Sequence, residues 1–87
     1  MNKSEIRTEL KKIISAYYNI SPSKINDDMM IFNLDNSLEG LQLAIIIQIN
    51  FGISFQLIEL DITHYYDMEQ YIVDKYKLFD FKLDNAN

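Results

Sequence analysis

Residues able to perform covalent chemistry are few in this chain of 87 residues. It contains one histidine, His64, and no cysteine, which excludes thiol nucleophiles, disulfides and thiolate metal sites. A Ser–His–acid triad would have to use His64, and no Gly-x-Ser-x-Gly nucleophile elbow is present. The two isolated glycines cannot form a loop that cradles a phosphate. We therefore expect that the chain alone is not an enzyme.

One set of residues has the spacing of a metal site. Asp61, His64 and Asp67 stand at i, i+3 and i+6, which could gather three ligands around an ion. Solvated residues at the start of a helix have the same spacing. The pair Asp27-Asp28 lacks the alternating ligands and the glycine of a calcium loop. We expect no metal site.

Ser37 has a more distinctive position than the other serines. It stands at the start of a predicted helix, after a long connection, beside the acids Asp35 and Glu39. A hydroxyl there is exposed, and the free N–H groups and positive dipole end of the helix would tolerate an attached phosphate. From these residues alone, an ordinary first-turn serine in a good capping stretch is the simpler interpretation.

The elements that position Ser37 are predicted to be helices. The chain has two glycines and one proline, and long stretches at helical spacing, which predict an all-α domain. The first helix is expected to begin with Ser4 as N-cap and to end by Asn19. One stripe forms its apolar face: Ile6, Leu10, Ile13, Ile14 and Tyr17.

The rest of the chain is predicted to contain one long connection and three further helical segments. Residues 20–36 form the connection, which four apolar residues are expected to pin across the core: Ile20, Ile25, Ile31 and Phe32. A second helix is predicted over about residues 36–51, with Asp35 or Asn36 as cap and Gly52 as its C′ residue. A short helical turn is predicted over 55–60 and a last helix over 65–76. We expect a domain over residues 1–76 and a tail, 77–87, whose placement the pattern does not predict.

The second helix has two apolar faces. On a helical wheel one sector collects Gly40, Leu43, Ala44, Ile47 and Phe51, and a roughly opposite sector collects Leu38, Leu41, Ile45 and Ile49. A small bundle rarely buries a helix on all sides, so one sector is expected to be exposed, and an exposed apolar stripe usually marks a partner site. The alternative is that the long connection or the aromatic tail covers it.

Charge is divided unevenly along the chain. Residues 1–26 carry five basic and two acidic side chains, whereas 27–87 carry three basic and eleven acidic ones, which gives the net charge of −5. This balance argues against a nucleic-acid partner. The acidic block either steers basic partners or only keeps a small protein in solution.

The sequence shows no sign of a membrane segment. Its longest apolar run, residues 43–47, is too short to span a bilayer, and the first seven residues are charged where a secretion signal would turn apolar. We therefore expect a cytoplasmic protein without membrane insertion.

Several short motifs, taken in order, resemble the acyl carrier protein family. Asn36-Ser37-Leu38-Glu39, followed by Leu43, Ile47 and Phe51-Gly52-Ile53, is similar to the family's Asp-Ser-Leu-Asp … Phe-Gly-Ile segment. Further matches lie on both sides of it: Ile20-x-Pro22-x-x-Ile25, Ile31-Phe32 and Asp67-Met68-x-x-Tyr71-Ile72. The resemblance covers about residues 4–76.

The resemblance implies a four-helix carrier fold, with a long first loop and a short third helix, and a 4′-phosphopantetheine arm esterified to Ser37. Such a carrier performs no chemistry itself; the thiol of the arm holds an acyl or aminoacyl cargo as a thioester. Its partners would be a phosphopantetheinyl transferase and loading and transfer enzymes with basic patches. These would dock on the second helix of a monomer, through Leu38, Leu41, Gln42, Ile45 and Ile49.

The chain departs from the family around the modified serine. The family's Gly-x-Asp-Ser is replaced by Leu34-Asp35-Asn36-Ser37, so the glycine is absent and an amide precedes the serine. These changes suggest a specialised carrier. They also leave a second interpretation open: a carrier-like helical module that is never modified and binds a protein through the same apolar face.

Overall fold

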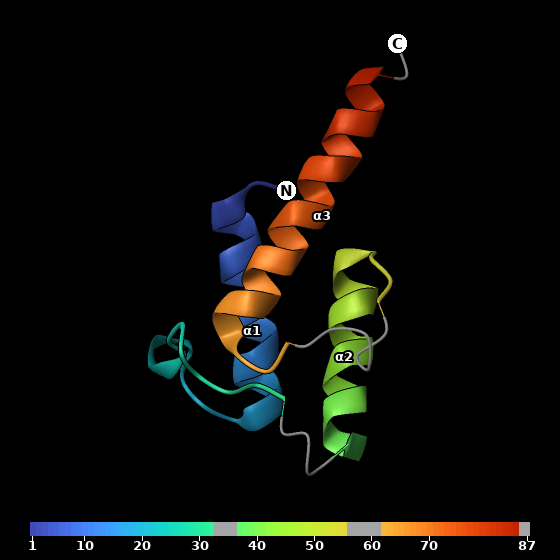
Figure 1. Cartoon of the computed structure of the whole chain (residues 1–87). Coiled ribbons are helices and arrows are strands. Elements are labelled where there is room, and N and C mark those ends of the chain that lie inside the picture. Colours follow the sequence, from blue (N-terminus) through green and yellow to red (C-terminus); the bar gives the residue numbers. More distant parts are fainter. Residues whose placement is uncertain (33–36, 56–61, 86–87) are drawn as a thin grey trace.

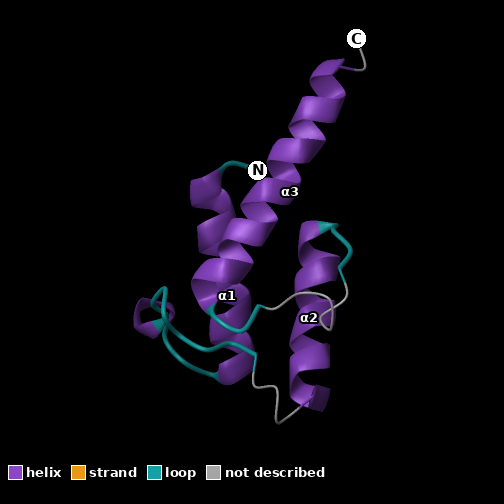
Figure 2. Cartoon of the chain, in the orientation of Figure 1, coloured by secondary structure: helices purple, strands orange, loops and turns teal. Residues whose placement is uncertain are grey.

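Helices form the regular structure of the chain. The computed structural model describes residues 1–32, 37–55 and 62–85, and of residues 37–39 and 78–85 it describes the backbone alone. The elements in these ranges are α1 (Lys3–Tyr18), the 3-10 turn η1 (Pro22–Lys24), α2 (Ser37–Phe51) and α3 (Tyr65–Asn85). They include no strand (Figure 2). The all-α class is confirmed with three α-helices, and the predicted short helix over 55–60 falls mainly on residues 56–61, outside the described ones.

The three helices pack with α1 in contact with both of the others. In Figure 1, α1 runs in the opposite sense to α2 and α3, and the last turns of α3 extend past the beginning of α1. The core between them is formed almost entirely by apolar side chains, with Leu10, Ile14, Leu43, Ile47 and Ile72 at 0% exposure. Each helix therefore buries one stripe, as the helical spacing predicts.

The start of α1 differs from the prediction. Asn2, not Ser4, is the N-cap: its side chain accepts the backbone N–H of Glu5 at 2.8 Å, and the Glu5 carboxylate accepts the N–H of Asn2 at 3.1 Å. This reciprocal pair is a capping box, and it satisfies two N–H groups where a lone serine would satisfy one. The predicted apolar stripe is confirmed, since Ile6, Leu10, Ile13 and Ile14 are buried.

The long connection is pinned as predicted. Ile25, Ile31 and Phe32 are each no more than 2% exposed, and Ile20 packs partly buried against the same core. The N–H groups of Ile31 and Phe32 both donate to the carbonyl of Thr63, at 2.7 and 3.1 Å. The connection is therefore held both by burial and by the segment that precedes α3.

The predicted end of α2 is confirmed by the structure, whereas the predicted end of α3 is not. Gly52 follows α2 in the left-handed conformation, with φ of 63°, and Ile53 N–H donates to the carbonyl of Gln48 at 3.2 Å, so the predicted C′ glycine is confirmed. By contrast, α3 does not end near Tyr76. It continues to Asn85, so most of the segment predicted as a separate tail is a continuation of this helix.

Candidate functional site

The candidate site begins where α2 begins. Ser37 is the first residue of α2, followed by Leu38 and Glu39, whose backbones are helical and whose side chains lie outside the described part of the structure. Asp35 and Asn36, predicted as the neighbours of the modified serine, also lie outside the described residues. In the first turn of any α-helix the N–H groups have no acceptor within the helix, so Ser37 stands at the positive end of α2.

The outward face of α2 is an exposed apolar stripe, defined here by Leu41, Ile45 and Ile49. These side chains are 50%, 53% and 74% exposed, and they follow each other at intervals of four residues, one above the next. Gln42 is exposed beside them, and its Oε1 accepts the hydroxyl of Tyr17 on α1 at 3.1 Å. The stripe is therefore accessible on the protein surface, while the side chain of Gln42 is hydrogen-bonded to α1.

The inward face of α2 accounts for why this stripe points outward. Leu43, Ala44, Ile47 and Phe51 are each no more than 3% exposed and belong to the hydrophobic core. The two apolar sectors of the sequence are thus one buried face and one exposed face. Among the described residues, neither positions 20–32 of the long connection nor another segment buries the exposed one.

The acidic block of the sequence is only partly a surface feature. Among its described members, Asp27, Asp28, Asp67 and Asp74 are exposed, but Glu69 is 1% exposed and faces the interior. The exposed stripe itself has no charge, because residues 40–51 contain no acidic or basic side chain. Any attraction of a basic partner must therefore come from acidic side chains outside residues 40–51.

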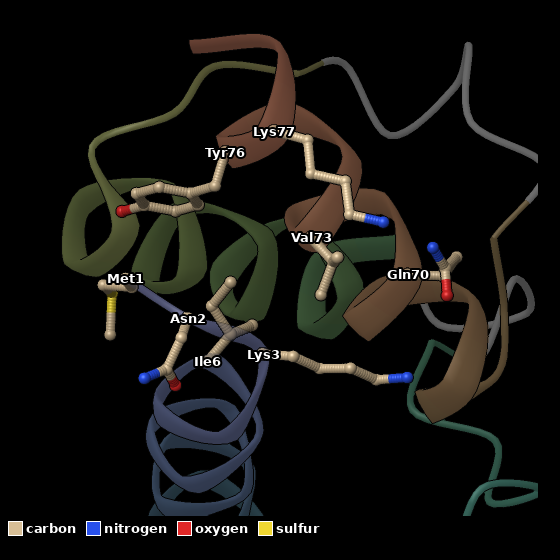
Figure 3. Close-up of a pocket in the computed structure, with 8 residues that line it drawn as sticks. All are labelled: Met1, Asn2, Lys3, Ile6, Gln70, Val73, Tyr76 and Lys77. Atoms are coloured by element: carbon tan, nitrogen blue, oxygen red, sulfur yellow. The ribbon is translucent and has the colours of Figure 1, made fainter. Parts of the chain in front are cut away.

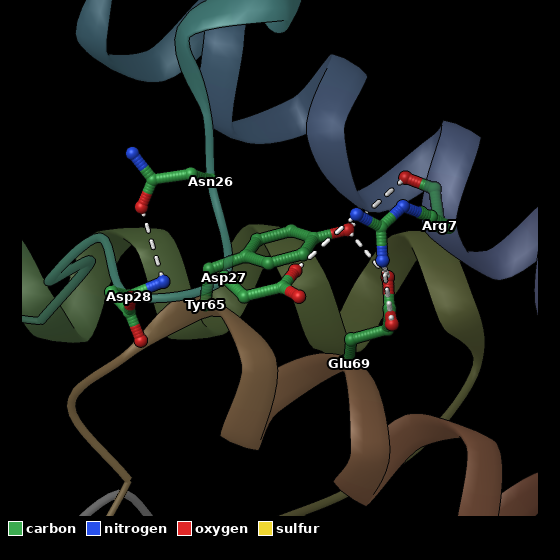
Figure 4. Close-up of polar contacts among 6 residues, drawn as sticks. All are labelled: Arg7, Asn26, Asp27, Asp28, Tyr65 and Glu69. Atoms are coloured by element: carbon green, nitrogen blue, oxygen red, sulfur yellow. Dashed lines mark hydrogen bonds and ion pairs between the residues drawn. The ribbon is translucent and has the colours of Figure 1, made fainter.

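The buried Glu69 belongs to a polar cluster that joins α1, the long connection and α3 (Figure 4). Nη1 of Arg7 lies 3.2 Å from both carboxylate oxygens of Glu69, and Nη2 lies 3.3 Å from Oδ1 of Asp27. The hydroxyl of Tyr65 donates to Oε1 of Glu69 at 2.7 Å. The charge of Glu69 is thus compensated by one cation and one hydroxyl, which is the condition for burying a carboxylate.

This cluster changes the titration of two of its members. Burial, followed by the hydrogen bond to Glu69 and the negative charge of that residue, raises the pKa of Tyr65 well above its ordinary value. Burial acts to lower the pKa of Arg7, but attraction to Glu69, Tyr65 and Asp27 outweighs it, so the pKa of Arg7 is raised. Both groups remain in their ordinary protonation states at neutral pH.

This cluster was not among the features predicted from the sequence, although a signal for it was present. Glu69 stands four residues after Tyr65 and one after Met68, so it occupies a position in the buried stripe of α3. Arg7 follows the buried Ile6 in the same way on α1. An internal ion pair is indicated when a carboxylate occupies a buried-stripe position on one helix and an arginine occupies a similar position on another. That the two side chains meet is shown by the tertiary structure alone.

Of the three residues considered for a metal, two lie in the described part of the structure. Nδ1 of His64 lies 2.7 Å from the hydroxyl of Thr63, Asp67 is exposed, and Asp61 lies outside the described residues. The described side chains contain no group of three histidine or carboxylate ligands that could hold an ion.

One hollow of about 260 Å³ lies between the first turn of α1 and the middle of α3 (Figure 3). Lys3 and Lys77 stand at its rim, and the buried side chains of Ile6 and Val73 line its interior. The beginning of α2 lies at the other end of the helical body (Figure 1). The hollow is therefore separate from the surface around Ser37.

Two further findings concern the chain as a whole. None of the helices, within the described residues, is long and apolar enough to cross a membrane. Comparison of the chain with protein-family models, with curated proteins and with solved structures finds no match.

Proposed function

We propose that this protein is an acyl or aminoacyl carrier of the cytoplasm, with a 4′-phosphopantetheine arm attached to Ser37. The observation that carries the proposal is the architecture of α2: Ser37 begins the helix, and Leu41, Ile45 and Ile49 form an uncovered apolar stripe leading away from it. The motifs that resemble acyl carrier proteins support the same assignment. The proposal includes their four-helix fold, with the short third helix in the segment 55–60.

The position of Ser37 fits the attachment of a phosphodiester. The N–H groups in the first turn of an α-helix have no acceptor within the helix, and the helix dipole places partial positive charge there, so a phosphate on the hydroxyl of Ser37, the first residue of α2, would be stabilised. The arm would supply a terminal thiol that holds the cargo as a thioester. The role of this chain's own residues is to present that arm and to bind the enzymes that use it.

The exposed stripe supplies the docking surface in this proposal. Leu41 and Ile45 lie one and two turns from Ser37 on the same helix, so an enzyme bound there has the attachment site within reach. Loading and transfer enzymes with basic patches fit a protein of this charge, because the chain has a net charge of −5 and exposed acids such as Asp28 and Asp67 stand on its described surface, while the stripe itself is apolar.

A second function rests on the same stripe. Asn36 removes the negative charge that precedes the serine in the family, and the glycine before it is missing. A helical module that binds a partner through Leu41, Ile45 and Ile49 without any modification would need neither the negative charge nor the glycine. The two functions differ in a single covalent event at Ser37.

Intact-mass analysis after incubation with coenzyme A and a broad-specificity phosphopantetheinyl transferase separates the two functions. We expect the mass of one phosphopantetheine arm to be added to the protein and none to Ser37→Ala. A known carrier, treated in parallel, shows that the transferase is active. If that control is modified and this protein is not, the unmodified module is the better account.

Docking is tested with Leu41→Glu and Ile45→Glu. Both side chains are about half exposed, so each substitution should change the free energy of unfolding little while weakening partner binding. Binding of the wild-type protein to its partner should also weaken as salt is added, because the attraction between surface charges is screened over about 8–10 Å. If either variant unfolds the domain, the stripe belongs to the core and the docking assignment is wrong.

A further inference from the structure

A tight turn in the long connection carries Asp27 to the junction of α1 and α3 (Figure 4). Asn26 closes this turn: its Oδ1 accepts the N–H of Asp28 at 3.1 Å, and its carbonyl accepts the N–H of Met29, also at 3.1 Å. The carbonyl of Asp27 accepts the N–H of Tyr66, in the first turn of α3, at 3.1 Å. Asp27 therefore stands at the tip of a closed turn that is already attached to α3.

The side chain of Arg7 joins this turn to both helices. One nitrogen of its guanidinium binds Glu69 of α3 and the other binds Asp27 of the connection, while its backbone belongs to α1. A guanidinium can bridge two carboxylates because its donors form a planar fork, whereas the ammonium of lysine is a point charge. We call the three residues Arg7, Asp27 and Glu69 the Arg7 clasp.

The Arg7 clasp holds the segment that leads to the start of α2. Beyond the turn, the N–H of Tyr65 donates to the carbonyl of Met29 at 2.8 Å, and the N–H of Phe32 donates to the carbonyl of Thr63 at 3.1 Å. Phe32 is 1% exposed, and Ser37 follows it by five residues. Loosening of the turn therefore acts on residues 29–32, whose buried Ile31 and Phe32 belong to the same hydrophobic core as α2.

We infer that Arg7 is a positioning residue for the beginning of α2: by bridging Asp27 and Glu69 it holds the long connection against α3 and so sets how Ser37 is presented to a partner enzyme. The presentation to an enzyme rests on the proposed carrier function, whereas the hold on the connection does not. The contact with Glu69 attaches the Arg7 side chain to α3, and the contact with Asp27 attaches it to the long connection.

The test uses Arg7→Lys and Asp27→Asn, which break the bridge without leaving Glu69 buried opposite an uncharged side chain. Lys11→Gln is the matched control, because Lys11 also lies over the Tyr65 ring, 5.6 Å from its centre, but no contact joins it to Asp27. Amide hydrogen exchange is followed at Tyr66, which reports the turn, and at Leu41, which by helical geometry pairs with Ser37. The amide of Ile14 reports global unfolding.

We expect Arg7→Lys and Asp27→Asn each to speed exchange at Tyr66 and Leu41 by about two- to five-fold relative to Ile14, the range for loss of a partly exposed ion pair. The double variant should add nothing further, because both changes remove one bridge. Unchanged exchange at Leu41, equal acceleration at Ile14, or the same effect from Lys11→Gln would overturn the inference.

The enzyme assay then tests presentation. In both clasp variants the transferase KM should rise with kcat unchanged, in proportion to the fall in the fraction of molecules that hold Ser37 in the competent position. A fall in kcat alone, or an unchanged KM, would contradict the inference. If the wild-type protein is not modified at all, the proposed carrier function fails, and the exchange measurements alone decide whether Arg7 positions α2.

Discussion

Ile47 and Ile49 stand two residues apart on α2, yet Ile47 is 0% and Ile49 is 74% exposed. Replacing each in turn with alanine makes the same chemical change in the same helix, so the difference between the two variants isolates burial. The comparison asks whether α2 packs through the face that contains Ile47 and leaves the other face free.

The burial of the two side chains determines how much unfolding free energy each variant should lose. Each substitution removes three carbon atoms, at about 0.8 kcal/mol for each one that is buried, so the transfer term is about 2.4 kcal/mol for Ile47. The cavity adds to it, which places Ile47→Ala in the range of about 2–5 kcal/mol. Ile49 is about a quarter buried, so the transfer free energy lost in Ile49→Ala is about 0.6 kcal/mol. The better helix propensity of alanine offsets about 0.4 kcal/mol of this loss.

Thermal and urea unfolding, followed by circular dichroism, measure both variants. For a domain of this size 1 kcal/mol corresponds to about 4–8 °C, so Ile47→Ala should lower Tm by at least about 10 °C and Ile49→Ala by less than about 4 °C. An Ile49→Ala variant as unstable as Ile47→Ala would mean that the stripe is covered. Two small effects would mean that α2 does not pack through its Ile47 face.

Three further outcomes are expected. Asn2→Ala should lower the free energy of unfolding by about 0.5–2 kcal/mol and Ser4→Ala by less than about 0.5 kcal/mol, and the reverse order in urea unfolding would make Ser4 the cap. The folded state keeps Tyr65 protonated where the unfolded chain loses that proton, so stability should fall as pH rises beyond about 10, by up to about 1.4 kcal/mol per pH unit. Urea titrations of Tyr65→Phe should show a shallower alkaline decline, and an unchanged slope would contradict the assignment. Asn36→Asp should leave Tm unchanged but raise the initial rate of Ser37 modification by a generic transferase; equal rates would mean that Asp35 or Glu39 already supplies the charge.

The parts of the fold that depend on local spacing could be predicted from residue positions. The 3.6-residue period is a property of the helix, so the buried stripe of α1 and the two apolar sectors of α2 could be predicted from residue positions alone. Gly52 could be predicted as the end of α2 because a left-handed residue favours glycine whatever its surroundings. Ile25, Ile31 and Phe32 were recognisable as anchors because isolated apolar residues in a polar connection have few other places to go.

Contacts between groups on different elements could not be predicted in this way, because they depend on how the helices pack. The wheel shows two apolar sectors on α2 but does not tell which one is covered; packing against α1 and the shared hydrophobic core buries the Ile47 sector and leaves Ile45 exposed. Charge counting placed Glu69 in an acidic surface, whereas a cation from a residue 62 positions away and the Tyr65 hydroxyl allow it to be buried. The periodic pattern of α3 weakens after Tyr76, yet the helix continues to Asn85. For the two faces of α2 and for Glu69 the physical reason is the same: the free energy of burying a side chain depends on the partner it finds, and that partner lies far away in the sequence.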